Sequence, residues 1–345
     1  MKKTLRSYIA LDLHHSHTVI EAQTPSGGVQ LQRDVPTEPS HLREVVKAVR
    51  GPKGVVLEEG PMADWAMRVI EPYVDEVIVC DPRRNRLIAQ DGAKSDDIDA
   101  GKLAELYRLG SLRPVHHPRR VSMVDLRSWV WAYHDQVILT TAAKNKVKAV
   151  LRMAGISYGH AEVYSLGHRD EWLRRMPRKS AREHLLLRYG NLDDLEARRQ
   201  MIRQRLFRIA RRHPVAKRFL AIPGYGPIRA LTFLVIVDTP FRFPRVQKLW
   251  RYGGLGLDKK QSGDPAKGRL RPGSQYNRRL KAVAKGAAER ALSLPGGNPF
   301  EVVYKRLLEK GVKEPLARLT VARKMLSVPW GMWKSGEEYK PALVT

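Results

Sequence analysis

Alternating apolar and polar residues in the first hundred positions predict a strand-rich region. Three short runs come first, separated by a histidine-rich turn and a Pro-Ser-Gly-Gly turn, which is typical of an antiparallel meander. Later runs alternate with segments of helical spacing. The predicted strands are 7–13, 18–23, 29–35, 55–57 and 76–80, and the predicted helices are 39–49 and 63–73. Three antiparallel strands followed by β-α-β units predict an α/β, RNase H-like layer.

The middle of the chain shows the spacing of long helices instead. No strand pattern occurs between 121 and 212, and apolar residues recur at steps of three and four in the runs 122–153 and 183–212. This predicts a helical hairpin or coiled coil with a loop near 155–179. The second run is rich in arginine, which indicates either an ordinary solvated face or a surface that follows phosphates beside a dimerisation seam.

The remaining residues predict a mainly α-helical region that opens on a glycine-rich turn. An apolar segment, the turn 223–227 and a second apolar segment form a helix-hairpin-helix-like pattern. Its glycines let the turn approach a phosphate, and the next helix offers free N–H groups; a plain turn between core helices is the simpler alternative. We therefore expect an α/β domain, a helical arm and a C-terminal domain, and their bounds are 1–115, 116–214 and 215–345.

Composition and charge favour a polyanionic partner. The 345 residues include 63 Lys+Arg and 35 Asp+Glu, a formal net charge of +28, and such a field attracts nucleic acid. The single cysteine, Cys80, lies in an apolar run and excludes an intrachain disulfide and a multi-cysteine zinc site. No stretch approaches the length of a membrane span, so we expect a protein of the prokaryotic cytoplasm without a membrane partner.

Carboxylates at the ends of apolar strands give this basic chain its candidate chemistry. Asp12 follows the run 8–11, and Glu58 follows 54–57. In an RNase H-like sheet the first and fourth strands are neighbours, so these two side chains would come close. Asp96 and Asp99 open a predicted helix and share one face, although capping of the helix N-terminus would also explain them. Such carboxylates suit one or two Mg²⁺ ions, with Mn²⁺ as a substitute, for phosphoryl transfer.

A candidate nucleophile lies in a basic loop of the C-terminal region. Ser262 precedes a glycine and is surrounded by lysine and arginine. A serine attacks a phosphate only if its proton is removed and the developing charge is stabilised, which cations and a metal ion would do. By itself the Ser-Gly pair is more typical of a turn. Far from this serine, in the turn next to Asp12, the cluster of His14, His15 and His17 is best explained as surface histidines, because Mg²⁺ does not need imidazole ligands.

In this order, the segments resemble the DEDD transposases of the bridge-RNA-guided insertion-sequence family, which includes the pilin-gene invertases. The run 94–100 is very close to the family's Lys-Thr-Asp-x-x-Asp-Ala, and 57–61 is similar to the segment that carries its glutamate. The runs 222–227, 254–263 and 273–280 resemble its Pro-Gly-Ile-Gly-Pro, serine and Gly-Asn-x-x-Leu-Arg blocks. The chain departs from the usual glycine, proline and glycine of these blocks at Pro61, Asp258 and Asp264.

The resemblance implies a site-specific DNA recombinase that excises and inserts its own mobile element. Asp12, Glu58, Asp96 and Asp99 would bind the metal, with Glu59 and Asp97 as bystanders. Ser262, rather than Ser274, would form a covalent phosphoserine link to DNA. The implied partners are double-stranded donor and target DNA, a structured non-coding guide RNA, and further copies of the chain in a dimer or tetramer whose protomers share the site. The residues expected to contact nucleic acid are Arg83, Arg84, Lys94, Gly224, Gly226, Lys259, Lys260, Arg269, Arg271, Arg278 and Lys281.

Two other functions fit parts of the same pattern. The first region alone would support a metal-dependent nuclease that resolves four-way junctions by water attack, with no serine intermediate. The basic helical arms alone would support a non-catalytic scaffold that binds RNA or DNA. Undiminished cleavage with Mg²⁺ in Ser262→Ala would favour the junction nuclease over a recombinase. Unchanged activity after Asp12→Ala together with Asp99→Ala would favour the non-catalytic scaffold.

Overall fold

The computed structural model describes residues 4–82, 96–118, 120–159, 162–259, 270–272 and 275–344, and at 96–98, 257–259 and 270–272 it describes the backbone alone. The chain forms two compact units, Met1–His117 and Pro118–Thr345. No described helix has both the length and the apolar character to cross a membrane.

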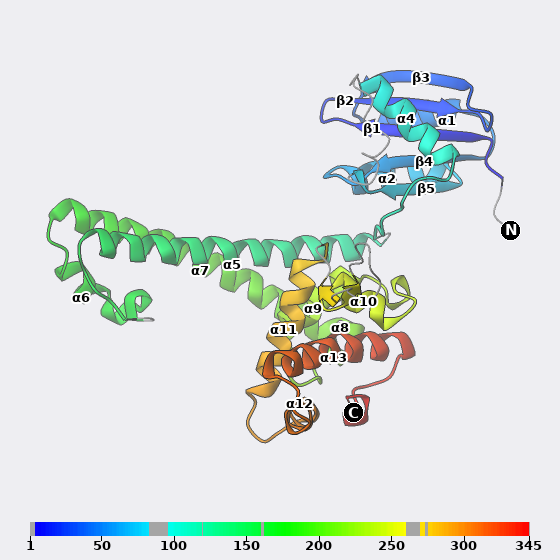
Figure 1. The fold of residues 1–345 in the computed structure, drawn as a ribbon. Helices are drawn as coiled ribbons and strands as arrows, with labels where there is room; N and C mark the ends of the chain where they lie inside the picture. Colours follow the sequence, from blue (N-terminus) through cyan, green and yellow to red (C-terminus); the bar gives the residue numbers. More distant parts are fainter. Residues whose placement is uncertain are drawn as a thin grey trace. The chain divides into compact units, whose positions relative to one another are not determined.

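A five-stranded mixed sheet forms the centre of the first unit (Figure 1). The strands β1 (Ser7–Leu13), β2 (His17–Gln23) and β3 (Val29–Pro36) are antiparallel, whereas β4 (Lys53–Glu58) and β5 (Glu76–Cys80) run parallel to β1. The order is β3-β2-β1-β4-β5. The predicted meander and the predicted adjacency of the first and fourth strands are therefore confirmed.

Helices cover both faces of this sheet. Alternate residues of a strand point to opposite faces. Ile9 and Leu11 accordingly pack with α1 (Pro39–Ala48) and α2 (Ala63–Ile70). Ala10 packs instead with Leu103, Ala104 and Tyr107 of α4 (Asp96–Arg108). The short helix η1 (Glu71–Tyr73) connects α2 toward β5.

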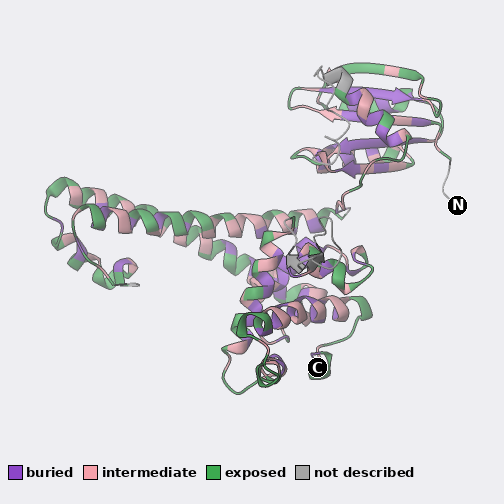
Figure 2. Ribbon diagram, viewed as in Figure 1, coloured by how far each residue is buried: buried purple, intermediate pink, exposed green. Residues whose placement is uncertain are grey.

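Two long helices that pack along each other dominate the first half of the second unit. They are α5 (Val121–Met153) and α7 (Lys179–Arg212), close to the predicted runs. Figure 2 shows much of their surface exposed, with a buried seam that includes Val147, Leu185 and Leu192. The connection expected as a loop instead contains η2 (Glu162–Tyr164), η3 (Leu166–His168) and α6 (Arg169–Arg174), because Trp172 is buried against the two long helices.

The second half of this unit is a helical bundle centred on α9 (Pro227–Val237), whose residues from Ala230 onward are all buried. Residues Leu126 and Val130 of α5 belong to the same core. A short antiparallel pair, β6 (Leu257–Lys259) and β7 (Leu270–Pro272), is added to the bundle. The other helices are α8 (Pro214–Phe219), η4 (Pro240–Arg242), α10 (Val246–Tyr252), α11 (Arg278–Leu292), α12 (Pro299–Glu309), α13 (Glu314–Ser335) and η6 (Pro341–Leu343).

Candidate carboxylate site at the strand ends

Asp12 and Glu58 occupy the same register position on adjacent parallel strands. Leu11 of β1 is the partner of Leu57 of β4, so the residues that follow them stand side by side at the carboxyl ends of the strands. Ala10 and Val56, two positions earlier, pack against α4. Because side chains two residues apart share a face, both carboxylates lie on the face of the sheet that α4 covers.

Contacts near both ends of α4 show how this helix crosses the sheet. Near its C-terminal end, the ring of Tyr107 lies 5.2 Å from that of Tyr8 at the start of β1, and its hydroxyl donates to Glu76 Oε2 at 3.0 Å at the start of β5. Nearer its start the helix lies over β2, where the Gly101 carbonyl oxygen accepts from Gln23 Nε2 at 3.2 Å. Asp99, which is exposed, precedes this contact by two residues, and its place beside Asp12 and Glu58 stays a prediction.

Asp12 has a polar partner in the turn that follows β1. Its Oδ2 atom lies 3.2 Å from Nε2 of His14, and its side chain is 25% exposed. The ring of His14 stacks on that of His17, with 4.7 Å between centroids. His14 is thus not an isolated surface histidine, and its position two residues from Asp12 was the signal for this contact.

The chemistry of these side chains fits a divalent ion, since carboxylate oxygens are the ligands that Mg²⁺ prefers. Among the side chains that the structure describes, no group of three or more His, Cys, Asp or Glu could hold a metal ion. The side chain of Asp96 lies outside the described residues. The full set of four carboxylates consequently stays a prediction, with Asp12 and Glu58 as the pair that the sheet brings together.

The predicted serine and much of the predicted basic surface lie outside the described residues. Residues 260–269, which include Ser262, connect β6 to β7. For Lys259 and Arg271, at the ends of this connection, only the backbone is described. The predicted residues outside the described part are Arg83, Arg84, Lys94, Lys260, Ser262 and Arg269. Their roles stay predictions.

The two glycines of the predicted phosphate-binding turn have different surroundings. Gly224 has φ +90°, and a Cβ atom there would meet the carbonyl oxygen of Ala287 in α11. A Cβ at Gly226, which caps the N-terminus of α9, would meet no atom within 4 Å. The close packing of α11 therefore explains why position 224 is a glycine. Position 226 has room for a side chain or for a ligand.

Two other predicted contacts lie at the start of α11. Asn277 caps this helix, because its Oδ1 accepts the N–H of Leu280 at 2.9 Å. Arg278 is exposed, and the Nζ of Lys281 lies 4.2 Å from the centre of the Tyr276 ring. Both cations border the bundle surface, and their contact with nucleic acid stays a prediction.

The fold and this pair of carboxylates define a mixed α/β domain consistent with a RuvC-like DEDD domain, followed by a mostly helical region. Residues 9–155 match the DEDD transposase model of IS110 elements, and residues 216–294 match the model of the transposase IS116/IS110/IS902 family. Together these matches cover more than half of the chain. The chain belongs to the IS116/IS110/IS902 family of transposases.

Individual relatives resemble a shorter part of the chain. An uncharacterized 44.8 kDa protein of insertion element IS116 from Streptomyces clavuligerus is 29% identical over 122 residues, which are 35% of this chain and 30% of that protein. An uncharacterized 42 kDa protein of insertion element IS900 from Mycobacterium paratuberculosis is 30% identical over 136 residues, 39% of this chain and 33% of that protein. The chain thus matches about a third of the length of these curated relatives.

Proposed function

We propose that this protein is the DNA transposase of an insertion sequence, cleaving and joining DNA strands with a divalent metal. The observation that carries this proposal is the register of Asp12 and Glu58 on adjacent parallel strands, on the face covered by α4. A pair of carboxylates held by a sheet is rigid and can position a scissile phosphate. Family membership and the charge of +28 support DNA as the substrate.

In this proposal Asp12, Glu58, Asp96 and Asp99 hold one or two Mg²⁺ ions. By helical periodicity, position 96 shares a face of α4 with Ala100 and Leu103, which pack on the sheet. When bound, the metal polarises the scissile phosphate and lowers the cost of ionising the attacking group. The carboxylates orient the phosphate, and the His14 imidazole beside Asp12 helps to fix the rotamer of that carboxylate.

We assign nucleophilic attack to Ser262. Its hydroxyl would attack the phosphorus and displace the 3′ or 5′ oxygen of the neighbouring nucleotide, leaving DNA covalently bound as a phosphoserine ester. The lysine and arginine residues of the same connection would stabilise the charge that develops on the phosphate oxygens. The hydroxyl proton would pass to a general base, and the displaced nucleotide oxygen would take up a proton in its place.

Selection of the DNA sites would come from a structured guide RNA, with the protein contacting backbone and shape. The arginine-rich α7 and its partner α5 would serve as the arm that joins protomers in a dimer or tetramer, so that carboxylates and serine meet from different copies. This assigns catalysis to 1–115, assembly to 116–214 and the serine, with the helix-hairpin-helix-like element, to 215–345. Sequencing of RNA that co-purifies from the native host tests the guide, and absence of a discrete RNA encoded beside the gene would contradict it.

Strand cleavage by the purified protein, with its co-purified RNA and element-end DNA, tests the active site. Asp12→Asn and Glu58→Gln should lower the cleavage rate about a hundredfold or more, the order lost with one electrostatic stabiliser. Glu59→Gln is the matched control, because Glu59 is exposed next to Glu58 and should retain activity. Ser262→Ala should abolish the covalent protein-DNA product; undiminished cleavage in that variant would favour a junction nuclease that uses water.

A further inference from the structure

A cavity of about 550 Å³ lies inside the second unit, between α5, α7, α9 and α11. The side chains that give it chemical character come from all four helices. They are Tyr133, His134, Arg203, Phe207, Arg229 and Arg279. We refer to this cavity as the arginine pocket.

The arginine pocket carries an excess of positive charge. Among the described residues that line it, none is acidic. Arg203 donates to Gln200 Oε1 at 3.3 Å, and Arg229 donates to the Gly224 carbonyl oxygen at 3.1 Å, so both guanidinium groups have neutral partners. Arg279 pairs with Asp135 at 3.3 Å, and its guanidinium lies 4.5 Å from the centre of the Trp131 ring. Of the three guanidinium groups, only that of Arg279 therefore has a carboxylate partner among the described residues.

Backbone donors reach the same cavity. Gly226 lines it and caps the N-terminus of α9. The first residue of α9, Pro227, has no N–H, and the first intrahelical bond runs from the Ala230 N–H to the Gly226 carbonyl oxygen. The N–H groups of Ile228 and Arg229 therefore have no partner within the helix and carry partial positive charge. Since no atom stands within 4 Å of a Cβ position at Gly226, an anion can approach them. Side-chain cations and backbone donors thus converge on one place, which favours an anionic group such as a phosphate.

The rest of the pocket wall is uncharged, with the rings of Tyr133, His134 and Phe207 beside aliphatic side chains. The guanidinium of Arg203 lies 4.5 Å from the ring centre of Phe207. His134 Nε2 lies 3.0 Å from Thr232 Oγ1, which donates its proton to the Ile228 carbonyl oxygen. The hydroxyl must therefore accept from Nε2–H. Burial lowers the pKa of His134, and the charge of Arg279 lowers it further despite Asp135, so the ring is neutral. A lone phosphate would leave this aromatic part empty.

We propose that the arginine pocket binds one unpaired nucleotide of a nucleic acid strand. Its phosphate is held by Arg203, Arg229, Arg279 and the first turn of α9, and its base lies against Phe207 and Tyr133. Aromatic rings bind bases only where these are unstacked, as in single strands and loops. The inference rests on the proposed action on nucleic acid and adds the place where an unpaired segment is held.

Fluorescence anisotropy of the full chain with a labelled oligothymidine of about 12 nucleotides, the span of a single-strand site, tests the phosphate contact. Arg203→Gln should weaken binding about tenfold at physiological ionic strength. Arg211→Gln is the matched control, because it removes the same charge from an exposed position of the same helix outside the pocket; it should weaken binding less than about twofold. Equal losses in the two variants would overturn the proposal.

A second variant tests the base contact. Phe207→Leu keeps an apolar side chain but removes the ring, and should weaken single-strand binding about fivefold or more while a duplex of equal length binds as before. Oligouridine in place of oligothymidine shows whether RNA or DNA is preferred. Equal loss on single strand and duplex would overturn base binding, as would displacement of the strand by inorganic phosphate as readily as by thymidine monophosphate.

Controls separate this proposal from the catalytic one. Asp12→Asn should abolish cleavage and leave oligothymidine binding unchanged, so failure of either proposal is visible without the other. Unfolding midpoints of Arg203→Gln and Phe207→Leu should equal that of the unsubstituted protein. If Arg203→Gln changed the oligomeric state and left strand binding intact, a second copy of the chain would occupy the pocket, and the nucleotide proposal would be wrong.

Discussion

Tyr107 lies directly over Gly54, with its hydroxyl oxygen in the space that a side chain at position 54 would need. Burial raises the pKa of this hydroxyl, and the charge of Glu76 raises it further, so it stays protonated and donates to Glu76 Oε2 at 3.0 Å. The absence of a side chain at Gly54 thus lets the end of α4 pack closely on the sheet. Because α4 carries Asp96 and Asp99 at its other end, this contact helps to place the candidate site.

Gly54→Ala should separate α4 from the sheet. The new methyl group overlaps the Tyr107 ring, and overpacking of this kind costs about 1–3 kcal/mol. We expect faster amide hydrogen exchange in α4 and β4, together with slower DNA cleavage. Gly60→Ala is the control, because no atom lies within 4 Å of its Cβ position. Unchanged exchange in Gly54→Ala would show that the contact does not hold the helix.

Gly224→Ala should destabilise the second unit. The residue has φ +90°, and a Cβ there meets the Ala287 carbonyl oxygen, so backbone strain and a steric clash add to about 2 kcal/mol or more. Tryptophan fluorescence during urea unfolding measures this, because six of the seven tryptophans lie in the second unit. Gly226→Ala should cost only about 0.5–1 kcal/mol, since alanine is the poorer N-cap. Equal losses would contradict the packing explanation of Gly224.

Much of the first unit follows from its sequence, because each strand alternates clearly and β-α-β units constrain the order of strands. Asp12 and Glu58 could be paired for the same reason, as register depends on local pattern. Trp172, by contrast, lies in a connection without periodicity, and its burial depends on tertiary packing. The arginine pocket could not be predicted either: Arg203, Arg229 and Arg279 belong to three helices, and only their packing brings them together.

Metal binding to the carboxylate site can be measured without catalysis. Bound Mn²⁺ should enhance the relaxation of water protons in solutions of the intact protein, and Mg²⁺ should displace it. Asp12→Asn replaces one carboxylate oxygen of the Asp12 and Glu58 pair and should weaken Mn²⁺ binding about tenfold or more. Loss of a group that only supports a metal ligand already weakens metal binding by about this factor. Glu59→Gln should bind as the unsubstituted protein does. Equal weakening in both variants would mean that Asp12 acts only through general charge.

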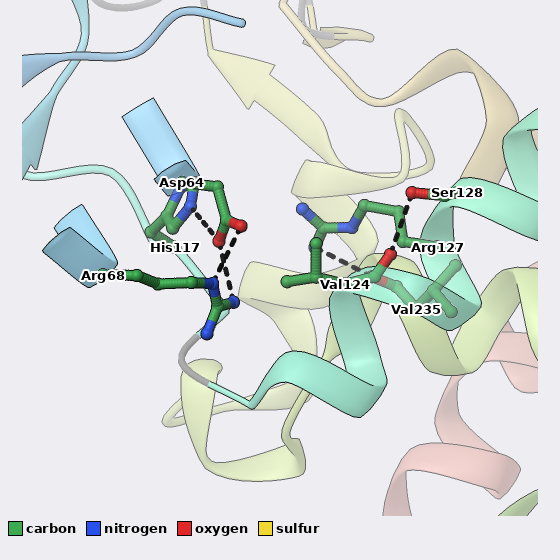
Figure 3. A network of polar contacts seen from close by, with 7 residues as sticks. All are labelled: Asp64, Arg68, His117, Val124, Arg127, Ser128 and Val235. Atoms are coloured by element: carbon green, nitrogen blue, oxygen red, sulfur yellow. Dashed lines mark hydrogen bonds and ion pairs between the residues drawn. The ribbon is translucent and has the colours of Figure 1, made fainter. Parts of the chain in front are cut away.

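The end of the first unit is attached to α2 by a carboxylate that contacts an arginine and a histidine. Figure 3 shows Arg68 and His117 pointing toward Asp64. Arg68 donates at 3.0 and 2.9 Å, and His117 Nε2 lies 3.1 Å from Oδ1. Burial alone would raise the pKa of Asp64, but the hydrogen bonds and charges of Arg68 and His117 outweigh it and lower the pKa.

A lowered carboxyl pKa predicts a specific loss of stability in acid. The pKa of Asp64 is near 4 in the unfolded chain and lower than that in the folded protein. At a pH above the unfolded pKa, the contacts of Asp64 contribute fully to the free energy of unfolding. This contribution is lost as the pH falls through the folded pKa. Between pH 7 and pH 3, unfolding free energies should fall by about 1 kcal/mol more in the unsubstituted protein than in Asp64→Asn. Hydrogen exchange in 60–70 and 115–118 localises the effect, with Glu59→Gln as control. A parallel pH dependence in Asp64→Asn would show that the contacts of Asp64 do not stabilise this end of the unit.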